Sequence, residues 1–63
     1  MDYFMAKNDK QLGTCLRMLY SEKIQAHVET IVNSKGKIEF HVRIAASEDM
    51  FKKLKERYTI LIS

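Results

Sequence analysis

The side chains that could do chemistry in this 63-residue chain are two histidines, one cysteine and a few carboxylates. His27 and Glu29 lie in one segment where polar and apolar residues alternate, and His41 and Arg43 lie in another. A strand presents every second residue on the same face, so we expect these four side chains on one face of a sheet. Two imidazoles and a carboxylate are donors that zinc accepts. Arg43 would add a positive charge among them, so we predict neither a metal nor another cofactor.

Cys15 would need a nearby base to act as a nucleophile. Its spacing from Leu12 and Leu19 places it on the apolar side of a predicted helix, whereas both histidines belong to predicted strands and face away from the helices. We therefore predict that Cys15 is a small buried core residue. A single cysteine forms no internal disulfide, and the chain contains neither a glycine-rich phosphate loop nor a nucleophile elbow. The sequence predicts a protein that is not an enzyme.

The formal net charge is +3, and the basic residues are unevenly distributed. Residues 1–31 contain four Lys and Arg against four Asp and Glu, while residues 32–63 contain seven against four. The excess is concentrated in one predicted helix, at Lys52, Lys53, Lys55 and Arg57. Such a cluster can contact phosphates, although a solvated helix face is the more common interpretation. A basic accessory protein that associates with nucleic acid is therefore an alternative function.

Two helices are expected. Asn8 or Asp9 can cap the first, and Ser47 can cap the second, because a short polar side chain accepts a hydrogen bond from a free backbone N–H group. Gly13 lies inside the first helix, where it is either merely tolerated or allows a close approach to the sheet. In the second helix, Leu54 and Tyr58 belong to the predicted buried side.

Residues 25–33 and 38–44 predict a hairpin whose register follows from its loop. A three-residue loop over 34–36 pairs Val32 with Ile38, so that both apolar sets share a face, and it places Gly36 at the left-handed position. A two-residue loop would put the two sets on opposite faces. We therefore predict the three-residue loop.

Short apolar segments at 3–6 and 59–63 complete the predicted order as additional strands. The result is a single α+β domain over residues 1–63 with the ferredoxin-like split βαβ order (βαββαβ), an antiparallel sheet and two helices on one face. The alternative is a βαββα unit whose C-terminal segment pairs with another subunit.

The passage Leu16-Arg17-Met18-Leu19-Tyr20-Ser21-Glu22-Lys23-Ile24-Gln25-Ala26-His27-Val28 resembles the helix-to-strand passage of small bacterial ferredoxin-like proteins assigned to signal transduction. It is also similar to some ACT-like regulatory modules, as is the strand over 38–44 followed by Ser47-Glu48-Asp49. Such families often have Gly directly before the Ile that begins the strand, and Lys23 stands there in this chain. The resemblance implies a non-catalytic binding or regulatory module.

The sheet face turned away from the helices is where we expect function. A sheet face with apolar residues among polar ones commonly meets a partner, and a domain this small gains stability from a second subunit. We predict a homodimer or another protein partner, with a small phage or mobile-element inhibitor of a host protein as a further possibility. No targeting or membrane-spanning segment is recognisable, and a lone cysteine suits the cytoplasm. The predicted partner-binding residues are His27, Glu29, Ile31, Glu39, His41 and Arg43, with Phe4 and Leu61 as further apolar candidates.

Overall fold

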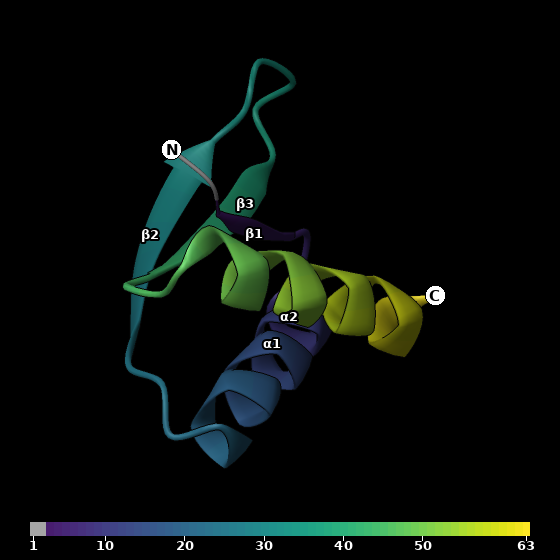
Figure 1. Cartoon of the computed structure of the whole chain (residues 1–63). Coiled ribbons are helices and arrows are strands. Elements are labelled where there is room, and N and C mark those ends of the chain that lie inside the picture. The colour runs from purple at the N-terminus through teal and green to yellow at the C-terminus, as the bar shows by residue number, and fades with distance from the viewer. Residues whose placement is uncertain (1–2) are drawn as a thin grey trace.

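The computed structural model describes residues 3–63, which form a βαββα unit (Figure 1). A three-stranded antiparallel sheet has the order β1-β3-β2 and packs against two helices. The predicted α+β class is confirmed. The elements are β1 (Phe4–Ala6), α1 (Asp9–Ser21), β2 (Ala26–Val32), β3 (Ile38–Ile44) and α2 (Glu48–Ile62).

The strand predicted over residues 59–63 was wrong, because helix α2 continues to Ile62. Neither Gly nor Pro interrupts residues 48–62, and the buried side of the helix extends from Phe51 through Leu54 and Tyr58 to Ile62, which packs against the core. Packing along this side outweighs the strand preference of Thr59 and its apolar neighbours. The described residues therefore have the alternative βαββα order, and the full ferredoxin-like order is not confirmed.

The predicted hairpin register is confirmed. Val32 pairs with Ile38 and Val28 pairs with Val42. The backbone N–H of Asn33 donates to the Lys37 carbonyl at 2.8 Å, which encloses the three-residue loop. Gly36 has a φ of 76°, a conformation that only glycine adopts without a steric cost.

Both helices cover the face of the sheet that carries Phe4 and Val42. The Phe4 ring lies 4.7 Å from the Phe51 ring and meets Tyr58 edge-on at 5.8 Å between centroids. The expectation that Phe4 lies on the open face was therefore wrong, because its pairing with Val42 turns it into the core. Leu61 belongs to α2 and not to the sheet. The buried core consists of Phe4, Cys15, Met18, Leu19, Val42, Phe51, Leu54 and Tyr58.

Helix α1 has a defined cap at each end. Asn8 Oδ1 accepts a hydrogen bond from the Gln11 N–H at 2.9 Å, as the sequence predicts for one of the two candidate caps. At the other end, the N–H groups of Lys23 and Ile24 donate back to the carbonyls of Tyr20 and Leu19, which is a Schellman motif. Lys23 has a φ of 57°, so a lysine occupies the left-handed position that favours glycine.

The β2–β3 hairpin extends beyond the helices (Figure 1). Val32 and Ile38, near its loop, therefore remain 66% and 55% exposed although they face the helix side of the sheet. Within residues 3–63, neither helix has the length and apolar content needed to cross a membrane.

Candidate functional site

The residues predicted for partner binding share the sheet face opposite the helices. His27 pairs with Arg43, Glu29 with His41, and Ile31 with Glu39. Each pair lies one position away from a pair that faces the core, so alternation turns these side chains to the other side. Their common placement follows from the observed register, and their role in binding stays a prediction.

Opposite charges on this face lie next to each other. Arg43 Nη1 lies 3.2 Å from Glu29 Oε1, across the two strands. His41 Nε2 lies 3.3 Å from Glu39 Oε1, two positions along the same strand. Both carboxylates are thus in contact with a nitrogen of the same face, and the surface carries no large excess of one sign.

Tyr3, which directly precedes β1, and Met5 in β1 complete this surface. Tyr3 stacks on the His41 ring at 4.1 Å between centroids with an interplanar angle of 18°, and Met5 pairs with His41 in the sheet. Sequence reasoning missed both residues, although the alternation around Phe4 could have assigned them to this face. We call the complete surface the open face; it consists of Tyr3, Met5, His27, Glu29, Ile31, Glu39, His41 and Arg43.

The structure does not gather the ligands of a metal site. Across residues 3–63, no three His, Cys, Asp or Glu side chains lie close enough together to hold an ion. The ring of His41 contacts Tyr3 and Glu39, while His27 pairs with Arg43.

Cys15 is completely buried in the core, as predicted. Burial raises the pKa of its thiol from 9.0 to about 11, because the apolar surroundings disfavour the thiolate. Burial also raises the pKa of Tyr58, and a charge on Cys15 would raise it further. A protonated, inaccessible thiol is a poor nucleophile.

The basic residues of α2 are exposed, but not all of them are free. Arg57 Nη1 lies 2.9 Å from Glu22 Oε1, an ion pair that joins α2 to the end of α1. Lys55 Nζ lies 5.9 Å from the centroid of the Phe51 ring. Within the described part of the chain, Lys52 and Lys53 form neither an ion pair nor a contact with an aromatic ring. The predicted phosphate-binding cluster is thus partly occupied by contacts within the protein.

Comparisons of the chain with protein-family models, with curated proteins and with solved structures found no match. The resemblance to signal-transducing and ACT-like modules therefore stays a prediction.

Proposed function

We propose that this protein is a non-enzymatic interaction module that binds a protein partner through the open face, and that this partner is a second copy of the chain. The observation that carries the proposal is the composition of this face. Tyr3, Met5 and Ile31 lie among polar side chains that already contact one another, with Glu29 beside Arg43 and Glu39 beside His41. Tyr, Met and Arg are enriched in protein interfaces.

The paired charges favour burial of this face against another protein. An isolated carboxylate would lose its hydration on binding, whereas Glu29 and Glu39 keep the contacts with Arg43 and His41. The energetic cost of excluding water from the face is correspondingly lower.

A second copy has the matching chemistry. A surface that carries both signs, as the open face does with Glu29 and Arg43, can complement itself across a two-fold axis. The small size of the domain supports the same partner, since an additional interface compensates for a small core. A reducing compartment such as the cytoplasm suits the lone thiol.

The test is the mass in solution of three single variants. We expect the wild type to have twice the 7.4 kDa of one chain, and Ile31→Glu to reduce this to one chain by placing a charge inside the interface. Ile60→Glu is the matched control, because Ile60 is 73% exposed on α2 and away from the open face. Lys53→Glu tests the basic helix in the same way. Sedimentation equilibrium measures the mass, and far-UV circular dichroism verifies the fold.

A wild-type mass of one chain would contradict the second copy as partner. A dimer that survives Ile31→Glu and dissociates with Ile60→Glu would contradict the open face as the interface, because the interface would then lie on α2. Salt-sensitive retention on heparin that Lys53→Glu abolishes would favour the nucleic-acid alternative.

A further inference from the structure

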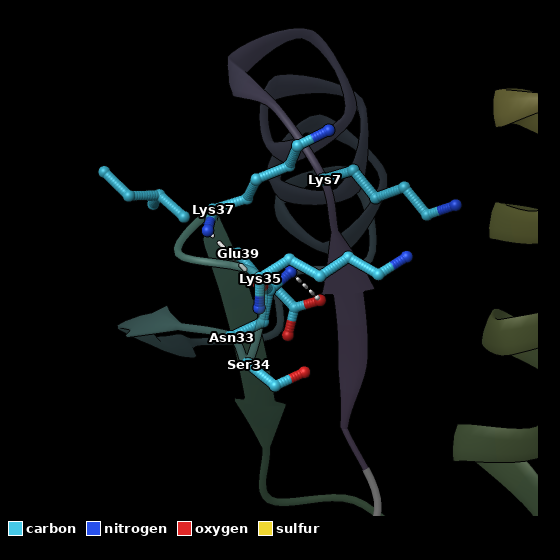
Figure 2. A pocket seen from close by; sticks show the side chains of 7 residues that line it. Lys7, Asn33, Ser34, Lys35, Lys37 and Glu39 are labelled. Atoms are coloured by element: carbon cyan, nitrogen blue, oxygen red, sulfur yellow. Dashed lines mark hydrogen bonds between the residues drawn. The ribbon is translucent and has the colours of Figure 1, made fainter.

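A hollow of about 540 Å³ lies at the end of the sheet where β1 leads into α1. Because Ala6 pairs with Phe40, β1 ends beside the start of β3, next to the hairpin loop. The lining thus comes from two segments that are far apart in the sequence (Figure 2). We call this feature the loop hollow; its lining residues are Lys7, Asn33, Ser34, Lys35, Lys37, Ile38 and Glu39.

The loop hollow is basic. Lys7, Lys35 and Lys37 line it, with Glu39 as the only acidic residue. Figure 2 shows the three lysine side chains extended to the same side of the loop. None of them forms an ion pair with another residue of the range 3–63.

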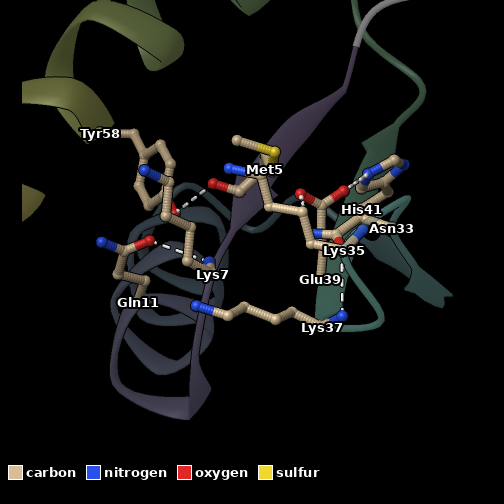
Figure 3. Close-up of polar contacts among 9 residues, drawn as sticks. All are labelled: Met5, Lys7, Gln11, Asn33, Lys35, Lys37, Glu39, His41 and Tyr58. Atoms are coloured by element: carbon tan, nitrogen blue, oxygen red, sulfur yellow. Dashed lines mark hydrogen bonds and ion pairs between the residues drawn. The ribbon is translucent and has the colours of Figure 1, made fainter.

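The Glu39 carboxylate, which lines the loop hollow, already contacts two neighbouring side chains. Glu39 Oε1 lies 3.3 Å from His41 Nε2, and Glu39 Oε2 accepts a hydrogen bond from Asn33 Nδ2 at 3.5 Å (Figure 3). These contacts hold the acidic group toward β3 and the start of the loop. The three ammonium groups therefore dominate the charge that a ligand would meet.

The backbone that carries the lysines is held by several hydrogen bonds. Asn33 Oδ1 accepts from the N–H groups of Lys35 and Lys37 at 2.8 and 3.0 Å. The Lys7 N–H donates to Gln11 Oε1 at 2.9 Å, which ties the end of β1 to helix α1 (Figure 3). Binding would therefore order side chains but leave the backbone in place, which reduces the entropic cost.

We propose that the loop hollow binds an oligophosphate anion through Lys7, Lys35 and Lys37. Ammonium groups bind phosphate oxygens as point charges, and three of them match an anion that carries several charges. Among residues 3–63, no aromatic ring lines the hollow, and Ile38 is the only large apolar side chain in its lining. The ligand would thus be recognised by its phosphates, and a nucleoside attached to them would add little. This inference does not depend on the proposed dimer.

The experiment is a titration of the full chain with inorganic triphosphate at low ionic strength. Calorimetry measures the affinity, and NMR chemical-shift changes of the backbone amides locate the site. The test variant is Lys35→Gln with Lys37→Gln. The matched control is Lys52→Gln with Lys53→Gln, which removes the same charge from α2. We expect the test variant to bind at least about tenfold more weakly, because it loses two of the three ammonium groups that would donate charge-assisted hydrogen bonds to the phosphates. The control should change the affinity little, and wild-type shifts should centre on Lys7 and residues 33–37.

A parallel titration with ATP separates the two sources of the same phosphate chemistry. Equal affinities for inorganic triphosphate and ATP are expected from a site that contacts only phosphates. A markedly tighter complex with ATP would overturn recognition by phosphates alone.

Two other outcomes would overturn the proposal. The first is absence of binding at millimolar triphosphate, and the second is an equal loss of affinity in both double variants, which indicates diffuse attraction to a basic protein.

Discussion

Cys15 shows how burial alone changes the chemistry of a residue. The side chain is fully buried, and its thiol has a pKa of about 11 in place of the usual 9.0. A group whose pKa is raised on folding binds its proton more tightly in the folded state than in the unfolded state. Its contribution to stability is therefore complete below pH 9 and is lost as the pH rises toward 11.

We predict that the free energy of unfolding falls more steeply between pH 9 and pH 11 in the wild type than in Cys15→Ala. The variant is less stable at every pH because truncation leaves a small cavity, but it lacks the thiol that ionises on unfolding. Urea denaturation followed by circular dichroism measures both slopes. Burial raises the pKa of Tyr58 in both proteins, whereas the further rise that a charge on Cys15 causes is lost in Cys15→Ala and belongs to the same difference in slope. Equal slopes would contradict the assignment to Cys15.

At the scale of the element, helix α1 carries an unfavourable residue at two positions, one inside the helix and one directly after it. Gly13 lies inside the helix, where an added Cβ would meet only the end of the flexible Arg17 side chain, at 3.4 Å. A close approach to the sheet therefore does not explain this glycine. Lys23 occupies the left-handed position after the helix, where glycine would be free of strain.

We predict that Gly13→Ala and Lys23→Gly each stabilise the protein by about 1 kcal/mol. Alanine restricts the unfolded chain at the first site, and glycine removes a steric cost at the second. Gly36→Ala provides the opposite control, since a φ of 76° is unfavourable for alanine. Thermal and chemical denaturation of the three variants check the signs. Destabilisation by Gly13→Ala would show that Arg17 cannot move away.

The end of helix α2 could not be predicted from the local sequence. Thr59-Ile60-Leu61-Ile62 has the composition of a strand, and the sequence therefore predicts a strand there. The same residues also continue the buried helical side that includes Leu54 and Tyr58. Local preference did not distinguish these outcomes, because the deciding energy comes from packing against the core.

At the scale of the whole molecule, a hydrogen bond joins the first strand to the last helix. The Tyr58 hydroxyl donates to the Met5 carbonyl at 2.9 Å, across 53 positions in the sequence (Figure 3). The Tyr58 ring also packs edge-on against Phe4. This contact holds β1 in place on the core side, while Met5 contributes its side chain to the open face.

We predict that Tyr58→Phe lowers the free energy of unfolding by about 1 kcal/mol, because it removes one hydrogen bond and keeps the ring. Tyr20→Phe is the matched control, since Tyr20 is 84% exposed and its change should have little effect. Urea denaturation provides the comparison. A loss of similar size in both variants would contradict a specific role for the Tyr58 hydroxyl.

The amino-acid sequence by itself determined the start of the second helix, the hairpin and the faces of its strands, and it narrowed the cap of the first helix to Asn8 or Asp9. These depend on short-range chemistry: the caps at Asn8 and Ser47, the left-handed Gly36, and alternation with a period of two. The grouping of His27, Glu29, His41 and Arg43 on one face followed from the same alternation.

Only the tertiary structure decided the end of α2, the stacking of Tyr3 on His41, and the meeting of Lys7 with Lys35 and Lys37 around the loop hollow. Each depends on contacts between segments that are distant in the sequence. Propensity and periodicity describe neighbours along the chain, so they contain no information about which distant segment supplies the packing surface or the second half of a site.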